Sequence, residues 1–348
     1  MLMASEKGPL DSIFDNLMRS ETIFKSGDVL RATYVPDELP HRQEQIARLG
    51  MILSSSLRGS TPSNVFIYGK TGTGKTAVAK YVLKYLSAKT KGSASDAPSL
   101  RTAYINCKVV DTNYRVLSNL CKETGLDVPF TGLPTDEVYR RFVDEISDKN
   151  ELVIIVLDEV DMVVKKDGDD VLYDLTRVNT SLKRGRVSLV GISNDLKFKD
   201  YLDPRVVSSL SEEEVVFPPY TAPELQDILR QRAGMGFRDG VLDEGVINLC
   251  AALAAREHGD ARRALDLLRV SGELCERAGE HKVTEKHVRA AQVSREYDTV
   301  TETIRTLPIQ SKLVLYTIFL LEKAGEKEVI TGSVFDVYGE FCGKLWLD

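Results

Sequence analysis

A glycine-rich stretch at residues 69–76 has the residue types and spacing needed to bind phosphate. It follows the pattern G-x-x-x-x-G-K-T and consists of Gly69, Lys70, Thr71, Gly72, Thr73, Gly74, Lys75 and Thr76. The backbone N–H groups of such a loop converge on phosphate oxygens, Lys75 reaches the β and γ phosphates, and Thr76 offers a hydroxyl ligand to Mg²⁺. A strand-like run precedes the stretch and a helical pattern follows it, which is the context that this motif requires. The sequence therefore predicts a nucleotide site rather than an ordinary glycine-rich turn.

An acidic cluster follows the apolar run at residues 152–157. It places Asp158, Glu159 and Asp161 at the end of a buried strand, where like charges repel one another. A bound Mg²⁺ would relieve this repulsion, because Asp158 would hold the water shell of the metal and Glu159 would orient and polarise the attacking water. The alternative is a strand that runs into a solvated acidic turn. The phosphate loop upstream favours the metal-dependent interpretation.

Two further positions have side chains suited to the γ-phosphate. Asn194 follows the apolar run at 187–192, and its amide could bond the attacking water or the phosphate, although an Asn here could also simply start a turn. Asp260 is a natural N-cap, which places Arg262 and Arg263 in a first helical turn, where the helix dipole disfavours cations. A nearby anion would remove that conflict, so one of these arginines is expected to reach the γ-phosphate. Otherwise both extend from the surface into water.

Five short apolar runs predict the strands that must position these residues. They lie at 65–68, 102–106, 152–157, 187–192 and 214–217. Helical patterns separate them, so the expected fold class is α/β, with a parallel sheet and helices on both faces. After residue 217 the strand signal stops, and helical patterns follow at 222–232, 243–256, 260–278 and 284–295. We therefore expect a nucleotide-binding domain at 1–217, an all-helical domain at 218–296 and a third segment at 297–348, with a short extended piece at 329–330.

Composition narrows the class of protein and its partners. The 348 residues carry a net charge of -6, so any contact with nucleic acid must come from a local basic patch and be sensitive to salt. Five dispersed cysteines and four unpaired histidines indicate neither a disulfide framework nor a zinc site. The longest apolar run, 313–321, is about half the length needed to cross a bilayer, and the acidic N-terminus lacks the apolar core of a signal peptide. We expect an intracellular protein with no membrane partner.

Several flanking segments make the pattern more specific. They are Tyr34-Val35-Pro36 with Leu39-Pro40-His41-Arg42, Leu202-Asp203-Pro204-Arg205, Phe217-Pro218-Pro219-Tyr220 and the run at 254–265 that contains Gly259-Asp260-Ala261-Arg262-Arg263. With the phosphate loop, the acidic cluster and Asn194, in this order and followed by a helical lid, the chain resembles an AAA+ ATPase. It closely resembles the replication initiators of the archaeal origin-recognition and cell-division-control type. The similarity runs from about Ile23 to Asp348.

This resemblance implies where further site residues lie. It places the strand before Asn194 between the strands of the phosphate loop and the acidic cluster. It assigns the adenine pocket to Tyr34, Val35, Pro36, Tyr220 and Arg232. It also implies that Arg205 is an arginine finger, given in trans to the nucleotide of a neighbouring subunit. The alternative for Arg205 is a helix-start residue paired to Asp203.

The resemblance also implies how the chain contacts DNA. The insertion at 108–134 would touch the duplex through Lys108, Arg115, Lys122 and Phe130, although these charges could equally form a solvated helix face. Relatives continue past the position of Asp348 into a recognition helix and a β-wing. The segment 297–348 is therefore expected to be an incomplete winged-helix domain.

The function implied by the resemblance is an ATP-dependent DNA replication initiator that binds origin DNA and recruits or loads the replicative helicase. Its cofactors would be ATP or ADP and Mg²⁺, and its other partners would be neighbouring initiator subunits. Slow Mg²⁺-dependent hydrolysis would act as a switch, in a cytoplasmic, nucleoid-associated protein. Two alternatives stay open: another AAA+ ATPase of the clamp-loader-like or remodelling kind with robust turnover, and a nucleotide-gated scaffold with negligible hydrolysis. A small-molecule kinase fits less well, because Glu159 beside Asp158 favours the activation of water.

Overall fold

The computed structural model describes residues 22–90, 98–129, 131–210, 213–326 and 328–345. Phe130, an expected DNA contact, lies outside these ranges. The chain divides into two compact units, with the boundary between Val288 and Arg289. The first unit holds the sheet and the helices around and after it. The second begins at Arg289 and holds most of one long helix and the two helices that follow it.

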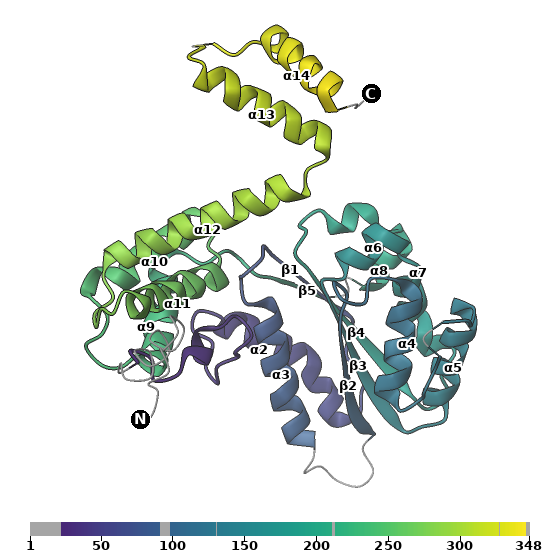
Figure 1. The fold of residues 1–348 in the computed structure, drawn as a ribbon. Coiled ribbons are helices and arrows are strands. Elements are labelled where there is room, and N and C mark those ends of the chain that lie inside the picture. Colours follow the sequence, from purple (N-terminus) through teal and green to yellow (C-terminus); the bar gives the residue numbers. More distant parts are fainter. Residues whose placement is uncertain (1–21, 91–97, 130, 211–212, 327, 346–348) are drawn as a thin grey trace, which may run out of the picture. The chain divides into compact units, whose positions relative to one another are not determined.

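Within the described ranges, five parallel strands of the first unit form one sheet (Figure 1). They are β1 (Val65–Tyr68), β2 (Ser99–Asn106), β3 (Glu151–Asp158), β4 (Arg186–Ser193) and β5 (Glu213–Val216). The order across the sheet is β2-β3-β4-β1-β5, and each neighbouring pair is parallel. The predicted parallel α/β class is confirmed, and β2 begins at Ser99 rather than at Thr102.

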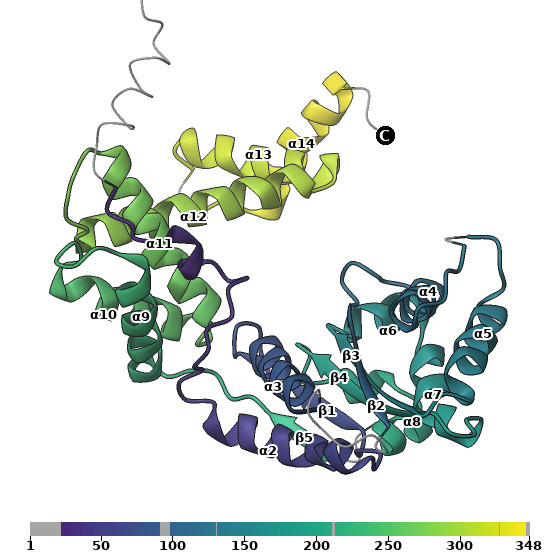
Figure 2. The same cartoon turned by 90° about the horizontal axis from the view of Figure 1, so that it is seen from below.

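Helices cover both faces of the sheet, as the view from below shows (Figure 2). One face carries α2 (Gln43–Leu53) and α3 (Lys75–Thr90), and the other carries α4 (Asn113–Thr124), α5 (Thr135–Ser147), α6 (Asp161–Asp167), α7 (Asp170–Arg177) and α8 (Pro204–Leu210). Short 3₁₀ turns are η1 (Gly27–Leu30), η2 (Ser54–Arg58), η3 (Val178–Thr180) and η4 (Phe198–Tyr201). Side chains of β3 alternate between the faces: Val153 and Ile155 join the core under α4–α8, while Ile154 and Val156 join the core under α2 and α3. Because both faces are covered, β3 is buried along its whole length, which explains its continuous apolar sequence.

The helical region after β5, called the lid below, contains α9 (Ala222–Gly236), α10 (Glu244–Arg256) and α11 (Ala261–Arg277), and these helices pack on one another. α9 begins with a capping box, in which Glu224 accepts a bond from the Thr221 N–H at 2.7 Å. α11 begins after Asp260, whose carboxylate accepts bonds from two backbone N–H groups of the first turn. Local capping therefore fixes where both helices start.

The end of the chain differs from the expectation at residues 329–330. α12 (Glu285–Thr306) runs without a break through 296–297, where the sequence suggested a domain boundary, and the unit boundary falls inside this helix. The second unit continues with α13 (Ile309–Lys323) and α14 (Thr331–Leu345), whose Tyr316 and Phe341 rings lie 5.6 Å apart. The extended piece expected at 329–330 pairs with no strand in the described part of the chain, and a strand needs such a partner for its hydrogen bonds. Over the same ranges, no helix has both the length and the apolar character needed to span a membrane.

Candidate functional site

A cavity of about 350 Å³ lies at the edge of the sheet where β1, β3 and β4 end. Its walls come from the N-terminal segment, the phosphate loop, the ends of two strands and the lid. The sequence-predicted residues that line it are Tyr34, Val35, Pro36, Gly72, Gly74, Lys75, Thr76, Asp158, Glu159, Asn194, Tyr220, Arg232 and Arg262. Because β4 lies between β1 and β3, the side chains that follow these three strands meet at one place.

Lys75 is the first residue of α3 and is almost fully buried. Its ammonium group donates hydrogen bonds to the carbonyl oxygens of Gly69 and Lys70, both at 2.7 Å. Burial lowers the pKa of Lys75 to about 8, while the negative charge of Asp158 acts in the opposite direction. A positive charge therefore lies inside the phosphate loop, at a helix N-terminus suited to anions.

The phosphate loop touches the lid so closely that two of its positions accept only glycine. Gly72 and Gly74 have φ angles of 75° and 93°, which other residues rarely adopt. A Cβ atom on Gly72 would overlap the Asp260 carboxylate, and one on Gly74 would lie 2.8 Å from the Tyr220 hydroxyl oxygen. The loop residues that are not in the cavity lining are Gly69, Lys70, Thr71 and Thr73. They shape the loop through their backbone, and the Thr73 hydroxyl donates to the Lys70 carbonyl at 2.8 Å.

Asp158 ends β3 as a buried carboxylate with two hydroxyl donors. Its Oδ2 atom accepts hydrogen bonds from Thr76 at 2.7 Å and from Tyr104 at 2.5 Å. Thr76 and Asp158, the two expected metal ligands, therefore lie together. Burial raises the pKa of Tyr104, and the bond to Asp158 acts in the same direction, so this phenol remains a proton donor. Tyr104 also lines the cavity and was missed from the sequence, because its place beside Asp158 depends on the pairing of β2 with β3.

The three carboxylates of the acidic cluster have separate environments. Glu159 lines the cavity, and its φ of 55° is unusual for a residue other than glycine. Asp161 instead accepts a bond from the Ser193 hydroxyl at 2.9 Å and a longer one from the Asn194 N–H at 3.4 Å. Asp161 thus anchors the end of β4 and helps to fix Asn194, while Glu159 faces the cavity.

The other end of the cavity is made by the N-terminal segment and the lid. Tyr34 and Val35 are partly exposed, and the guanidinium of Arg232 lies 4.6 Å from the centre of the Tyr34 ring. Arg232 is buried on α9 and donates to the carbonyls of Arg31 at 3.1 Å and Tyr34 at 3.3 Å. Burial lowers the pKa of Arg232, and Tyr34 opposes this shift. Arg232 thus holds the segment that presents Tyr34, Val35 and Pro36.

The two arginines at the start of α11 lie in different places. Asp260 Oδ1 accepts bonds from the backbone N–H groups of Arg262 at 2.8 Å and Arg263 at 3.2 Å. The Arg262 side chain lines the cavity, and its charge acts on Lys75. Arg263 forms an ion pair with Glu257 and is not in the lining. The structure therefore brings Arg262, and not Arg263, to the other predicted residues.

Arg205 lies outside the cavity lining, at the start of α8. Its guanidinium donates two bonds to the Asp203 carboxylate, both at 3.0 Å, and the side chain is largely exposed. These bonds raise the pKa of Arg205 and lower the pKa of Asp203 to about 2. Within one chain, Arg205 thus forms the helix-start pair that the sequence offered as the alternative to a finger.

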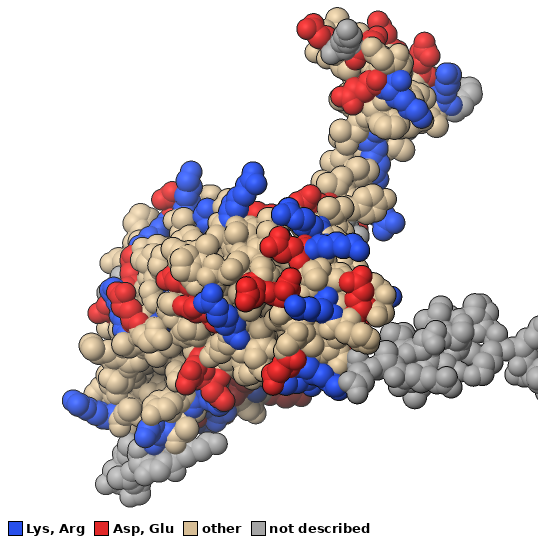
Figure 3. Space-filling model, turned by 90° about the vertical axis from the view of Figure 1, so that its left-hand side faces the viewer, with Lys and Arg blue, Asp and Glu red and all other residues tan. Residues whose placement is uncertain are grey.

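The expected DNA contacts lie after β2, away from the cavity lining. Lys108 and Lys122 are exposed, and Arg115 forms an ion pair of 3.1 Å with Asp111. Arg115 and Lys122 are two turns apart on α4, so they share one side of this helix. On the side of the molecule drawn in Figure 3, basic and acidic side chains are interspersed, in keeping with the net charge of -6.

The residues around the cavity fit a magnesium nucleotide. A buried ammonium, a hydroxyl–carboxylate pair and an arginine suit the phosphates and Mg²⁺, while an aromatic ring and aliphatic side chains suit a base. Among the described residues, no cluster of three or more His, Cys, Asp or Glu side chains could hold a metal ion. Mg²⁺ would therefore also take ligands from the phosphates and water, as it commonly does in nucleotide sites.

Comparisons with known proteins agree with this geometry. Family models match an AAA domain at residues 57–197, a Cdc6 AAA+ ATPase-type lid domain at 226–293 and a CDC6 C-terminal winged helix domain at 302–348. Among solved structures, the Aeropyrum pernix ORC1 protein in complex with DNA is 49% identical, with a TM-score of 0.81 over 94% of this chain and 84% of that one. The Aeropyrum pernix ORC2 protein in its ADPNP–ADP complexes is 26% identical, with a TM-score of 0.68 over 93% and 85% of the two chains.

A relative is similar to this chain over most of its own length. The ORC1-type DNA replication protein of Pyrococcus furiosus is 60% identical over 343 residues, which are 97% of this chain and 81% of the relative. Identity this high over this span leaves both the fold and the order of motifs unchanged. The chain therefore belongs to the family of ORC1-type DNA replication proteins, the replication initiators among the AAA+ ATPases.

Proposed function

We propose that this chain binds ATP with Mg²⁺ in the cavity and hydrolyses it slowly, so that the bound nucleotide acts as a switch. The observation that carries the proposal is the meeting of Lys75, the Thr76–Asp158 pair, Glu159, Asn194 and Arg262 at one cavity. Mg²⁺, when bound, supplies charge neutralisation at the phosphates. The contacts already described support the assignment of one task to each residue.

Each residue near the phosphates has its own task. Lys75 holds the β and γ phosphates, and Thr76 with Asp158 holds the metal and its water. Glu159 orients the attacking water and accepts its proton, Asn194 bonds that water or the γ-phosphate, and Arg262 neutralises the γ-phosphate from the lid. Tyr34, Val35 and Pro36 with Tyr220 and Arg232 hold the adenine. Arg263, paired to Glu257, acts indirectly by holding the start of α11.

Slow turnover follows if Arg205 acts on the nucleotide of a neighbouring subunit. Arginines supplied in trans contribute about 10³ to 10⁵ in rate, and Arg205 of the same chain is held by Asp203 outside the cavity lining. Specific activity should then rise with protein concentration, and Arg205→Ala should stay slow at every concentration while binding nucleotide normally. Fast turnover that is independent of concentration and unchanged by Arg205→Ala would contradict this arrangement.

The nucleotide state would control contacts with duplex DNA and with the replicative helicase in the nucleoid. The solved relative with 49% identity is a DNA complex, and Lys108, Arg115 and Lys122 supply basic side chains in the expected insertion. Engaging two to four phosphates predicts a slope of roughly -2 to -4 in log K against log salt. Replacing both Lys108 and Lys122 by Ala should make that slope shallower by about 2, as measured by fluorescence anisotropy. An unchanged slope would exclude these lysines from the interface.

The deciding experiment is ATPase turnover of the 348-residue chain with and without an origin-like duplex and the replicative helicase. A switch predicts a low basal rate that changes when the partners bind. A high basal rate that ignores both partners would favour a remodelling ATPase. Bound ATP that persists in every condition would favour a scaffold.

A further inference from the structure

Arg42 is a buried arginine that contacts three separate segments of backbone. Its Nε atom donates to the carbonyl of Thr73 at 2.8 Å, Nη1 donates to the carbonyl of His41 at 2.8 Å, and Nη2 donates to the carbonyl of Pro218 at 2.7 Å. Only 2% of the residue is exposed. The planar fork of a guanidinium can serve three acceptors in fixed directions at once, which a lysine cannot do.

The positive charge of Arg42 lies against an aromatic ring and not against a carboxylate. Among the described residues, no acidic side chain forms an ion pair with it. Its guanidinium lies 3.7 Å from the centre of the Tyr220 ring, a close cation–π contact, and Phe217 is further away at 5.8 Å. Burial lowers the pKa of Arg42, while Tyr220 and the more distant Glu224 act in the opposite direction. Burying the charge of an arginine costs desolvation free energy. A contribution to the charge of the protein surface therefore does not explain this buried position.

Two of the three carbonyls that Arg42 contacts, those of Thr73 and Pro218, belong to the phosphate loop and to the segment that leads into the lid. Thr73 lies inside the phosphate loop, and Pro218 lies in the link between β5 and the first lid helix, α9. Tyr220 in the same link lies against Gly74, because a Cβ atom there would be 2.8 Å from the Tyr220 hydroxyl oxygen. Arg42 therefore joins the phosphate loop to the lid link through a single side chain.

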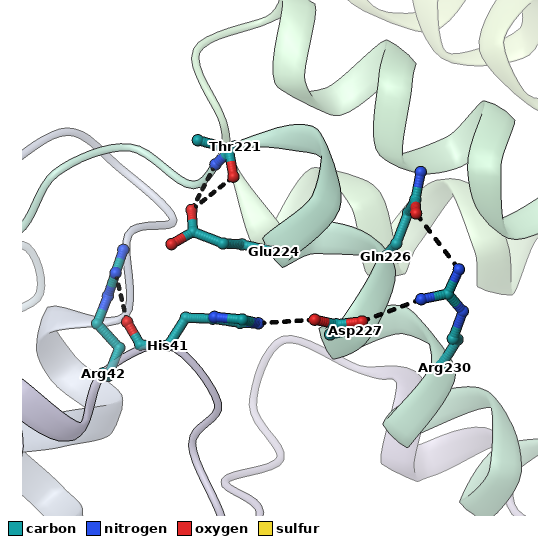
Figure 4. A network of polar contacts seen from close by, with 7 residues as sticks. All are labelled: His41, Arg42, Thr221, Glu224, Gln226, Asp227 and Arg230. Atoms are coloured by element: carbon teal, nitrogen blue, oxygen red, sulfur yellow. Dashed lines mark hydrogen bonds and ion pairs between the residues drawn. The ribbon is translucent and has the colours of Figure 1, made fainter.

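The residue before Arg42 makes a second contact with the lid, as Figure 4 shows. Nε2 of His41 lies 3.0 Å from the Asp227 carboxylate on α9, and Asp227 also bonds to Arg230 at 3.0 Å. His41 has a φ of 60°, a backbone conformation that is costly outside glycine and persists only where contacts hold it. The loop at 41–42 is thus fixed to the lid at two points and to the phosphate loop at one.

We propose that Arg42 is a positioning residue that couples the phosphate loop to the lid, so that nucleotide bound at the loop orders the link at 217–221 and helix α9. The inference rests on the proposed function, because it requires the cavity to bind nucleotide. Arg42 is absent from the cavity lining, so it acts through the Thr73 and Pro218 carbonyls rather than by touching the nucleotide.

The test is hydrogen–deuterium exchange of the full 348-residue chain with and without saturating Mg²⁺–ADP, together with the Kd for ADP. Three variants are compared: Arg42→Met, Arg42→Lys and the control Arg48→Met. Arg48 lies on α2, which begins directly after Arg42, is half exposed and forms a long ion pair of 3.8 Å with Glu213. Circular dichroism and thermal unfolding show which variants fold. Arg42→Lys retains a buried cation and is the more conservative change.

In the wild type and in Arg48→Met, ADP should slow exchange both at 69–78 and at 217–236. In Arg42→Met and Arg42→Lys, ADP should still protect 69–78, whereas protection at 217–236 should fall by at least half and the Kd should rise about tenfold. A general loss of stability would not reduce protection at 217–236 alone. If Arg42→Lys also lacks this protection, the three hydrogen bonds of the guanidinium are needed and a buried positive charge is not enough.

Several results would overturn the coupling role. It fails if either folded Arg42 variant keeps wild-type protection at 217–236, or if neither variant folds, which would make Arg42 a folding residue. It also fails if wild-type protection is confined to 69–78. If ADP protects no segment of the wild type and does not bind, the proposed nucleotide function fails as well, so the two failures are distinguishable.

Discussion

The phosphate end and the base end of the cavity are built in different ways. The phosphate end consists of Lys75, Thr76, Asp158, Glu159, Asn194 and Arg262. The first five lie at the ends of β3 and β4 or at the start of α3, which the phosphate loop joins to β1. The base end consists of Tyr34, Val35, Pro36, Tyr220 and Arg232, and these residues come from a segment before the sheet and from the lid. A rigid sheet thus fixes one end, while tertiary contacts such as the Arg232–Tyr34 contact of 4.6 Å hold the other.

This difference predicts separate effects on chemistry, phosphate affinity and base affinity. Substitutions at the phosphate end should affect every ligand that carries phosphates, and one of them should affect hydrolysis alone. Substitutions at the base end should affect only ligands that carry a base.

Glu159→Gln should reduce ATP turnover by about 10² to 10⁴ while leaving ATP affinity unchanged. The amide keeps the shape of the side chain but cannot accept the proton of the attacking water. Filter binding followed over time should show ATP that stays bound and intact. The exposed carboxylate of Glu123 on α4 is the control, and Glu123→Gln should behave as wild type. If Glu159→Gln loses nucleotide affinity as severely as Lys75→Ala, Glu159 does not activate water.

Lys75→Ala should weaken binding of ATP, ADP and inorganic tripolyphosphate by roughly 100-fold each. The change removes an ammonium that donates charge-assisted hydrogen bonds, which contribute up to about 3 kcal/mol. Isothermal titration calorimetry measures all three ligands. Lys84→Ala, further along α3 and exposed, is the control. Loss of ATP affinity with tripolyphosphate binding unchanged would place the phosphates elsewhere.

The sequence predicts the phosphate end better than the base end for a physical reason. The phosphate loop and the acidic residues after a buried strand can be recognised from short stretches of sequence. Parallel strands bring such residues to one edge of the sheet, and this does not depend on the rest of the fold. The sequence did not indicate a role for Tyr104 or Arg42. The contact of Tyr104 depends on the register of β2 with β3, and the contacts of Arg42 join segments that are far apart in the sequence. The base end could be assigned only from the family resemblance.

The unpaired segment at 329–330 has a related cause. Val329 and Ile330 have the β-branched side chains typical of strands, yet a strand forms only beside another strand, and the described residues offer none there. α12 continues through the boundary expected at 296–297, because the helical periodicity there carries no cap or break, so this boundary stays a prediction. Local patterns therefore predict element type more reliably than element partners.

Tyr34→Ala should weaken ATP and ADP binding by roughly 10- to 100-fold and leave tripolyphosphate binding unchanged. Stacking of a base on an aromatic side chain contributes about 1 to 3 kcal/mol, and tripolyphosphate has no base to stack. The same calorimetric series tests this, with the exposed Tyr85 on α3 as the control in Tyr85→Ala. Equal losses for ATP and tripolyphosphate would mean that Tyr34 shapes the whole cavity, and the division into two ends would be wrong.

The smallest expected effect is a pH dependence that belongs to the phosphate end alone. Burial lowers the pKa of Lys75 from its ordinary value of 10.5 to about 8 in the folded, nucleotide-free chain. Between pH 8 and 10.5 the unfolded chain therefore binds more protons at this group than the folded chain does, so the contribution of Lys75 to stability is unfavourable below pH 8 and is relieved as the pH rises. Phosphate binding needs the protonated ammonium, so affinity should move in the opposite direction.

ADP affinity should consequently fall about tenfold between pH 7 and pH 9, the range in which a group of pKa about 8 loses most of its charge. Calorimetry at pH 8.5 in two buffers of different ionisation enthalpy should show uptake of about three quarters of a proton per ADP bound, because a group of pKa about 8 is about one quarter protonated at that pH. Nucleotide phosphates titrate near pH 6, below this window. Lys75→Arg provides the control, because a guanidinium stays charged throughout and should remove both the pH dependence and the proton uptake. A wild-type affinity that is flat from pH 7 to 9 would mean that the Lys75 ammonium is fully charged before nucleotide arrives, and the phosphate end would then be more solvated than its buried lysine indicates.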